Sequence, residues 1–384
     1  MQVTHVRASN WRNFKTLDFP FDQRLFVVGP NAAGKSNLLD LFRFLGDIAR
    51  PGGGLQAALE QRGGLAKARS LFARNHRKGR LEIDIELADH VRWRYFLSIR
   101  GEKGGRNRPI VDAEWVECEG DRVLDRPDAH DRADPERLTQ THLEQISANH
   151  RFRAVAEHLA KVRYFHLVPQ IIRDPSRFSS TGQDPFGGDF IAQMNAVPER
   201  TRNAWLRRMQ TALQAAVPEF ESLKLEVDSA GRPHLIAGYR NWREQPARQS
   251  EADFSDGTLR LIGLLWTLVS APASGGTLLL EEPELSLNAS IVRSLPTVLA
   301  AAQRDRAMQV LLSTHAPELL DDEGVLPREV LVLQVTNDGT VASVLSQVEA
   351  ASDEIAAGLP TSEIVDGLIA RPDLSGLVAV GRGR

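Results

Sequence analysis

The sequence predicts an α/β protein with a mainly parallel central sheet, an antiparallel β subdomain and an inserted helical lobe. Three observations support this prediction. Apolar strands alternate with helical segments in the last third of the chain, which is typical of a parallel sheet. A glycine-rich loop joins a strand to an amphipathic helix near the N-terminus. Two strictly alternating segments between residues 81 and 99 indicate an antiparallel hairpin.

Composition excludes several classes of protein. The 384 residues are 42% hydrophobic and 25% charged, which is typical of a folded globular chain. The net charge of −3 excludes a general polycation. Cys118 is the single cysteine, so a disulfide framework and a cysteine-based zinc site are excluded. No apolar run approaches the ~18 residues of a membrane span, and the charged N-terminus does not resemble a secretory signal. We therefore expect a soluble, cytoplasmic protein without a membrane partner.

The first 100 residues contain clear periodicities. Val3–Ala8 alternates, residues 10–13 form a turn, and apolar residues between Phe19 and Val28 continue as strand. A helix is expected from Lys35 to about Ala49, because Leu38, Leu41, Phe42 and Leu45 form one stripe. Segments 81–87 and 91–99 are joined by a turn at residues 88–90. The second of these strands places Arg92, Arg94 and Arg100 on the face opposite its apolar residues.

The middle and end of the chain are less regular. Asp121–Arg137 alternates acid and base around two prolines and predicts a surface loop. Thr141 and Glu144 fit a capping box, so we expect a helix from there to about Lys161, followed by a strand at 162–168. Residues 173–188, rich in Pro, Gly and Ser, are expected to be mobile. Further segments predict helices at 200–216 and 259–269 and strands at 277–280, 309–312 and 330–335.

Charge is unevenly distributed. Residues 62–108 contain 13 Lys/Arg and 5 Asp/Glu, whereas residues 316–384 contain 4 basic and 12 acidic residues. One interpretation is a basic face that contacts nucleic-acid phosphates, formed by Arg74, Arg77, Lys78, Arg80, Arg92 and Arg94. The other is an ordinary solvated surface.

Gly29-Pro30-Asn31-Ala32-Ala33-Gly34-Lys35-Ser36 matches the phosphate-loop pattern G-x-x-x-x-G-K-[ST] at every fixed position. It follows an apolar strand and opens a helix, as phosphate binding requires, because backbone N–H groups and the helix N-terminus then surround the anion. Lys35 is expected to neutralise the β- and γ-phosphates and Ser36 to bind Mg²⁺. The alternative is a tight glycine turn before a helix.

Polar residues follow other apolar strands. Thr277–Leu280 precedes Glu281 and Glu282, where the first carboxylate can hold Mg²⁺ through water and the second can polarise the attacking water. His315 ends the next strand, although a single histidine there is more often structural. Ser255 and Gly257 precede an apolar helix, where they either cap the helix or bind an anion.

Together these segments resemble the ABC-type ATPase heads of the SMC, RecF and OLD group, and specifically compact AAA-labelled ATPases of bacterial defence. The segments that carry the resemblance are Asn10–Lys15 in the opening strand, Gly34–Asn37 (Walker A), Tyr164–Gln170 (Q-loop strand), Phe254–Thr258 (signature), Glu281–Glu284 (Walker B) and Ser313–Glu318 (switch histidine). Two positions depart from the pattern. Glu281 stands where Asp is commoner, and Leu285–Asn288 lacks the usual His-Pro of the D-loop. No long coiled coil separates the motifs, and the 69 residues after His315 are too few for a TOPRIM nuclease domain.

The resemblance implies a P-loop NTPase of ABC-ATPase head type. Residues 1–170 would form the N-terminal part of the ATPase lobe, 171–250 the helical insertion, and 251–384 the C-terminal part of the ATPase lobe. The implied cofactors are ATP and Mg²⁺, and the implied catalytic residues are Lys35, Glu282 and His315. The implied ligands of the nucleotide are Arg12, Asn13, Asn31, Gly34, Lys35, Ser36, Asn37, Ser255 and Gly257. Those of the metal are Ser36, Gln170 and Glu281.

The resemblance also implies a homodimer that encloses two ATP molecules, with Ser255 and Gly257 of one subunit capping the γ-phosphate held by the other. We hypothesise an ATPase that gates a DNA-directed effector in phage defence or DNA repair, with a separate nuclease or toxin as partner. The alternative is an ATP-driven sensor or scaffold subunit with slow turnover that assembles with a separate effector nuclease. A higher assembly of the chain is a further expectation. A transporter subunit is disfavoured by the signature and the opening strand.

Overall fold

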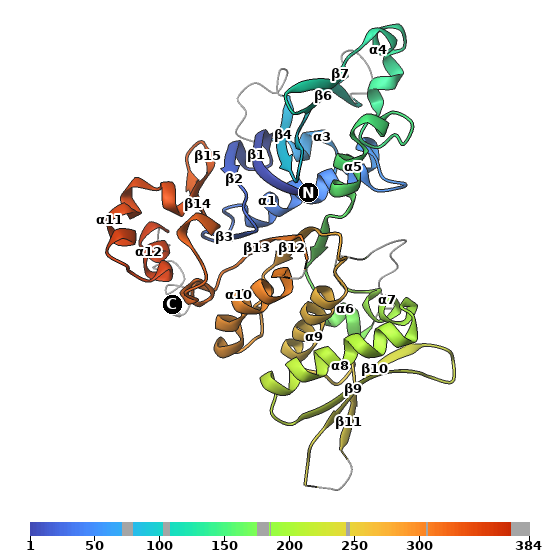
Figure 1. The fold of residues 1–384 in the computed structure, drawn as a ribbon, viewed down its shortest axis with the longest axis vertical. Coiled ribbons are helices and arrows are strands. Elements are labelled where there is room, and N and C mark those ends of the chain that lie inside the picture. Colours follow the sequence, from blue (N-terminus) through green and yellow to red (C-terminus); the bar gives the residue numbers. More distant parts are fainter. Residues whose placement is uncertain are drawn as a thin grey trace, which may run out of the picture.

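The computed structural model describes residues 1–70, 80–102, 108–174, 184, 186–242, 246–304 and 306–369. An antiparallel sheet, a mainly parallel sheet and a lobe of helices with a small sheet follow one another along the long axis (Figure 1). The first two enclose helix α1 (Lys35–Ala49), whose apolar stripe joins them into one core.

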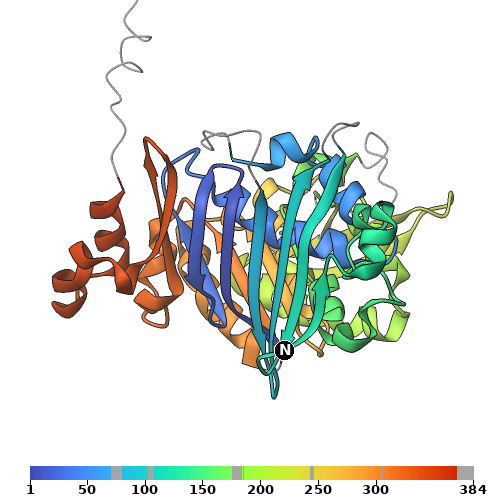
Figure 2. The same cartoon turned by 90° about the horizontal axis from the view of Figure 1, so that it is seen from above.

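The antiparallel sheet has the strand order β2-β1-β4-β5-β6-β7, and Figure 2 shows these strands side by side. Its strands are β1 (Gln2–Trp11), β2 (Phe14–Pro20), β4 (Leu81–Ala88), β5 (Arg92–Gly101), β6 (Pro109–Cys118) and β7 (Asp121–Arg126). Alternate residues such as Ile83, Ile85, Leu97 and Ile99 are fully buried against the core. The expected hairpin at residues 81–99 is confirmed.

The central sheet has the order β15-β14-β3-β13-β12-β8, in which all pairs are parallel except β14 with β15. Its strands are β3 (Arg24–Val28), β8 (Arg163–Phe165), β12 (Gly276–Glu281), β13 (Met308–Ser313), β14 (Val330–Thr336) and β15 (Gly339–Val344). The register pairs Glu281 with Ser313 and Ser313 with Val27. The carboxyl ends of the three central strands therefore meet at one edge, where ligands of α/β sheets bind.

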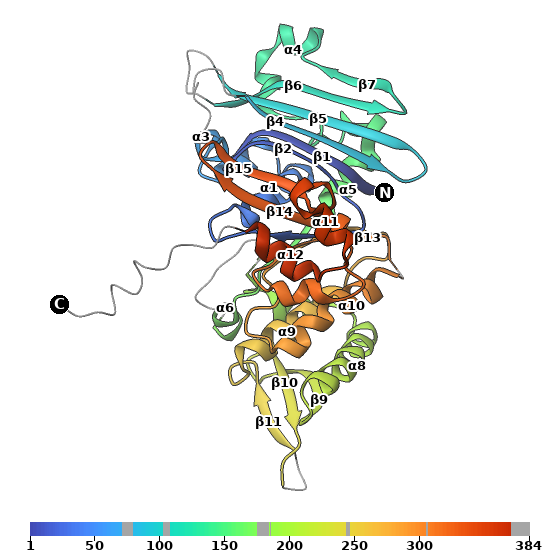
Figure 3. The ribbon, with the colours of Figure 1, turned by 90° about the vertical axis from the view of Figure 1, so that its left-hand side faces the viewer.

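The lobe combines helices with a three-stranded antiparallel sheet of order β11-β10-β9 (Figure 3). Its elements are α6 (Pro169–Arg173), α7 (Phe190–Ala196), α8 (Glu199–Ala216), β9 (Phe220–Val227), β10 (Pro233–Tyr239), β11 (Ala247–Ser250) and α9 (Asp256–Val269). The sequence analysis predicted the helices at 200–216 and 259–269 but not this sheet. Leu259 and Trp266 of α9 pack into the lobe core, so the lobe core extends beyond residue 250. The division of the chain after residues 170 and 250 stays a prediction.

The remaining helices cover the sheets. They are α2 (Leu55–Glu60), α3 (Leu65–Ala68), α4 (Ala129–Ala133), α5 (Arg153–Ala160), α10 (Ala289–Arg304), α11 (Ser352–Ala356) and α12 (Thr361–Leu368). Short 3₁₀ turns are η1 (Pro135–Thr139), η2 (Asn149–Phe152), η4 (Pro317–Asp321), η5 (Pro327–Glu329), η6 (Leu345–Gln347) and η7 (Glu349–Ala351). Helices α10 and α12 pack on the face of the central sheet opposite α1.

The prediction of a surface loop at Asp121–Arg137 is wrong, because the segment forms β7, α4 and part of η1. Two of its charged residues, Arg126 and Asp131, are buried in ion pairs, whereas most of the others are exposed. The Arg126 guanidinium lies 2.9 Å from carboxylate oxygens of both Glu114 and Asp131, and all three side chains are fully enclosed. Such pairing satisfies charges that a sequence pattern assigns to the surface.

The prediction of one helix from Thr141 to Lys161 is wrong in its first half. Thr141 and Glu144 exchange the expected capping bonds, with Thr141 N donating to Glu144 Oε1 at 2.6 Å, but these close a turn, and the α-helix begins only at Arg153. Glu144 also accepts from the backbone N–H of Leu55, which draws it to α2 instead. Most of segment 173–188, expected to be mobile, lies outside the described residues.

Within the described residues, no helix is both long enough and apolar enough to cross a bilayer.

Candidate functional site

The phosphate loop occupies the turn between β3 and α1, as predicted. Ala32 and Gly34 have positive φ values of 63° and 100°. A Cβ on Gly34 would lie 2.2 Å from the Asn13 amide, so only glycine fits there. Among the described residues no side chain caps the α1 N-terminus, which leaves its first N–H groups available to an anion.

Lys35 is held inside this loop. Its side chain is 6% exposed, and Nζ donates to the carbonyl oxygens of Gly29 at 2.9 Å and Pro30 at 3.3 Å. Burial lowers the pKa of Lys35, although the carboxylates of Glu282, Glu284 and Glu281 act in the opposite direction. It forms no salt bridge with any described residue, so a phosphate would give this buried cation its first close anionic partner.

Ser36 and Glu281 meet although 245 positions separate them in sequence. The Ser36 hydroxyl donates to Glu281 Oε1 at 2.5 Å, and the Tyr164 hydroxyl donates to Glu281 Oε2. Burial, with the Glu281 charge as a second cause, raises the pKa of Tyr164 well above its usual value, so the phenol keeps its proton. Tyr164 was not among the predicted site residues. No local sequence pattern indicates its role, because Tyr164 meets Glu281 through the pairing of β8 with β12.

These oxygens fit a magnesium ion bound together with a nucleotide. Mg²⁺ prefers oxygen ligands and in nucleotide sites takes one or two from protein and the rest from phosphates and water. Ser36 and Glu281 supply such a pair. The described residues contain no group of three or more His, Cys, Asp or Glu side chains that could hold a metal ion.

The three predicted catalytic side chains lie together. The His315 ring bridges the other two, with Nδ1 3.4 Å from Lys35 Nζ and Nε2 3.1 Å from Glu282 Oε1. Glu282 adopts φ 45°, a conformation that is strained for a non-glycine residue, and its N–H donates to Ser313 O at 2.9 Å. The strand register thus fixes Glu282 at the edge of β13, beside the switch histidine.

Glu284 and Thr314 hold the His315 segment in place through hydrogen bonds. Thr314 Oγ1 and the His315 N–H both donate to Glu284 Oε1, at 2.6 and 3.0 Å. Glu284 is only 6% exposed, and burial raises its pKa. Both residues lie within the predicted Walker B and switch-histidine motifs, but neither was predicted to have a role. The contact between them depends on strand register, so no local sequence pattern predicts it.

The signature segment lies on the lobe. Ser255 caps α9 and accepts a bond from Thr258 N at 3.1 Å, as predicted for a helix start. Gly257 is in tight contact with the D-loop, because a Cβ would lie 2.4 Å from Ser286 O. Arg173 pairs with Asp256 at 2.6 Å. None of the hydrogen bonds of this segment within the described chain reaches the phosphate loop.

Gln170 is also drawn to the signature. Its amide nitrogen donates to Asp256 Oδ2 at 3.3 Å, on the lobe side of the site. Its predicted role as a metal ligand stays a prediction.

The turn between β1 and β2 supports the phosphate loop. Asn13 donates to Ala33 O at 2.7 Å and accepts from Asn37 at 2.8 Å, and Arg12 pairs with Asp40 at 2.8 Å. These bonds hold the phosphate loop and helix α1 in place. Contact of Arg12, Asn13, Asn37 and the exposed Asn31 with a nucleotide stays a prediction.

The structure describes three of the six arginines and lysines of the predicted basic face, and all three are paired. Arg80, Arg92 and Arg94 form ion pairs with Asp112 at 2.6 Å, Glu119 at 3.3 Å and Asp84 at 2.6 Å. Arg74, Arg77 and Lys78 lie outside the described residues. Paired arginines offer less charge to a phosphate backbone than the sequence count suggested.

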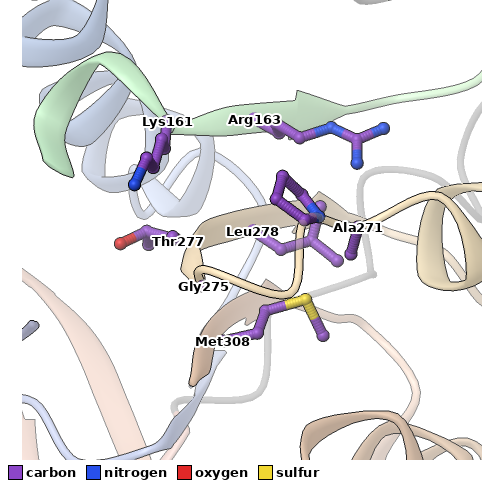
Figure 4. A pocket seen from close by; sticks show the side chains of 9 residues that line it. Lys161, Arg163, Ala271, Gly275, Thr277, Leu278 and Met308 are labelled. Carbon is purple, nitrogen blue, oxygen red and sulfur yellow. The ribbon is translucent and has the colours of Figure 1, made fainter. Parts of the chain in front are cut away.

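A pocket lies at the opposite end of β12 from Glu281 (Figure 4). Lys161 and Arg163 lie on one side of it and Met308 on the other, and Arg163 donates to Ser270 Oγ at 3.4 Å. No predicted site residue lines it, so the candidate nucleotide site remains at the carboxyl ends of the strands.

Residues 25–321 match the protein family described as "AAA domain, putative AbiEii toxin, Type IV TA system". The match includes the phosphate loop and the segments that carry Glu281, Glu282 and His315. No curated protein matches the chain.

Solved structures of SMC head domains share the fold. A head bound to the C-terminal winged-helix domain of ScpA superposes with a TM-score of 0.54 at 13% identity, covering 90% of this chain and 99% of that one. A head with an extended coiled coil, bound to the C-terminal domain of ScpA derived from Pyrococcus furiosus, gives a TM-score of 0.50 at 12% identity, covering 92% and 99%. The predicted fold, a P-loop NTPase of ABC-ATPase head type, is confirmed.

Proposed function

This chain belongs to that AAA-domain family, and from this premise we propose that it binds and hydrolyses ATP with Mg²⁺. The observation that carries the proposal is the assembly of Lys35, Ser36, Glu281, Glu282 and His315 at one sheet edge from three distant segments. A structural glycine turn has no need of a buried lysine and two carboxylates beside it.

Binding uses the phosphate loop. The α1 N–H groups and Lys35 would hold the β- and γ-phosphates, and Ser36 with Glu281 would hold Mg²⁺. The chemistry that Mg²⁺ would supply there is positive charge that offsets the charge of the phosphates. Because Lys35 is already desolvated, its attraction to a phosphate is stronger than it would be in water.

Hydrolysis uses Glu282 and His315. Glu282 accepts the proton of the attacking water as general base, and His315 orients the Glu282 carboxylate through the 3.1 Å contact. His315 is also near Lys35, so it can hold the γ-phosphate end of the site. Thr314 and Glu284 keep this histidine segment in place.

A second chain completes the site. The signature residues Ser255 and Gly257 lie on the lobe, and their hydrogen bonds within the described chain do not reach the phosphate loop. This separation supports a head-to-head homodimer in which each signature caps the γ-phosphate held by its partner.

The ATPase cycle gates a separate effector in phage defence or DNA repair. The signal that starts this cycle is either DNA or a protein. The ion pairs of Arg80, Arg92 and Arg94 weaken the support for a DNA trigger, because paired arginines offer less charge to phosphates. The second candidate function is a slow sensor or scaffold subunit that assembles with a separate effector nuclease.

The test is steady-state ATP hydrolysis by the purified chain, with and without duplex DNA, and with Lys35→Ala as the blank. Mg²⁺-dependent turnover that Lys35→Ala loses supports the ATPase, and turnover equal in both proteins contradicts it. Stimulation by DNA supports the DNA-directed effector. A rate that DNA leaves unchanged favours the protein trigger.

A further inference from the structure

The two oxygens of the Glu281 carboxylate have different partners. Oε1 accepts from Ser36 Oγ at 2.5 Å, whereas Oε2 accepts from the Tyr164 hydroxyl. The register of β8 on β12 pairs Tyr164 with Leu279, two residues before Glu281, so all three side chains are on the α1 side of the sheet. The hydroxyl contact is therefore built into the strand pairing.

The Tyr164 ring is itself fixed. It packs against the core between the two sheets, and the Arg43 guanidinium of α1 lies 5.0 Å from its centroid. A cation at that distance from the ring face is attracted to it. Tyr164 thus connects α1, which begins at the phosphate loop, to the carboxylate that ends β12.

A glutamate at the Walker B position needs such an anchor more than an aspartate does. Glu281 has one more rotatable bond than aspartate, and each added bond increases the number of rotamers that the carboxylate can sample. A hydrogen bond to Oε2 restricts these rotamers while Oε1 stays directed at Ser36.

We propose that Tyr164 is a positioning residue that holds the Glu281 carboxylate in the orientation required for Mg²⁺. The proposal rests on the proposed ATP-binding function of the same site. Tyr164 itself does not touch the nucleotide or the metal. It acts through Glu281 by fixing which oxygen faces Ser36.

The experiment measures equilibrium binding of N-methylanthraniloyl-ATP by fluorescence, in EDTA and across a MgCl₂ titration. Tyr164→Phe removes one oxygen and keeps the ring. The Mg²⁺ concentration at half-maximal binding should rise roughly tenfold, which corresponds to one hydrogen bond to a charged group. Binding in EDTA should change less than about twofold, because Lys35 and the loop are intact.

Tyr95→Phe is the matched control. Tyr95 also donates to a glutamate, Glu114 at 3.2 Å, but in the buried ion-pair network of the antiparallel sheet. Its loss should leave both titrations as in the wild type. Glu281→Asp provides a second arm, because the shorter side chain withdraws the carboxylate from the hydroxyl. Adding Tyr164→Phe to Glu281→Asp should shift the Mg²⁺ midpoint less than about twofold.

Three results would overturn the proposal: an unchanged midpoint in Tyr164→Phe, an equal weakening in EDTA and in MgCl₂, or a full tenfold shift added to Glu281→Asp. In each of these the wild type still binds the analogue with Mg²⁺, so the proposed function survives. A wild-type chain that binds no analogue overturns the proposed function and the role of Tyr164 together.

Discussion

Replacing Lys35 by methionine separates ligand binding from folding. Methionine is an unbranched side chain that ends at Cε, so it keeps most of the length of lysine and removes the ammonium group. In the structure Nζ has carbonyl partners and a histidine ring but no salt bridge to a described residue. The ammonium group is therefore positioned for a phosphate, and its removal should act mainly on the ATP-bound state.

The expected magnitude follows from linkage. An ATP concentration about one hundred times Kd stabilises the wild type by about 2.7 kcal/mol. For 384 residues that unfold as one unit, the entropy of unfolding converts this into a rise in Tm of about 3 °C. Loss of the charged contacts of Lys35 costs about 3 kcal/mol of binding, which weakens ATP more than a hundredfold. The ligand-induced rise should then fall below about 0.5 °C.

The assay is thermal unfolding followed by circular dichroism, with and without Mg-ATP. Lys224→Met, on the exposed side of β9, is the matched control and should keep the full rise. A rise in Tm of about 2 °C or more when Mg-ATP is added to Lys35→Met would contradict this role of Lys35, because the phosphates would then be held without this cation.

Three further outcomes are expected. Burial lowers the pKa of His142 to about 4, so the folded state resists protonation and stability is lost as pH falls from about 6.5 toward 4. His142→Leu removes this titration. Between pH 7.5 and pH 5 the variant should therefore lose about 2 kcal/mol less free energy of unfolding than the wild type, measured by urea unfolding. Thr314→Val should lower the free energy of unfolding in urea by about 2 kcal/mol, because the buried Glu284 carboxylate loses its 2.6 Å donor, and a change under about 0.5 kcal/mol would contradict that role. Arg173→Ala should weaken ATP-dependent dimerisation in sedimentation velocity, since the Asp256 carboxylate would face the partner's phosphate uncompensated, and adding Asp256→Asn should restore it.

Local patterns predicted the parts of the site that depend on neighbours in sequence. The phosphate loop needs glycine where φ is positive, and Gly34 meets that need within an eight-residue pattern. Ser255 caps α9 by the same kind of local rule. The apolar strands before Glu281 and His315 predicted their meeting at one edge, because parallel strands align their carboxyl ends.

Long-range pairing decided what the sequence could not predict. The sequence pattern placed Arg126, just before Pro127, in a surface loop, yet Glu114 and Asp131 balance its charge inside the protein. Tyr164 contacts Glu281, and Thr314 contacts Glu284, only because the register of the paired strands brings them together. The small sheet β9–β11 was missed because the two buried residues of β9, Phe220 and Leu223, are three positions apart and do not give the alternation typical of a strand.

In the proposed homodimer, ATP joins two chains around the sites that each leaves incomplete. Glu282→Gln keeps the shape of the general base but removes its ability to accept a proton, so ATP should remain bound and uncleaved. Multi-angle light scattering of this variant in saturating Mg-ATP should give twice the 42.5 kDa chain mass, and Lys35→Ala added to it should restore the monomer. A mass of 42.5 kDa for Glu282→Gln in saturating Mg-ATP would contradict the account.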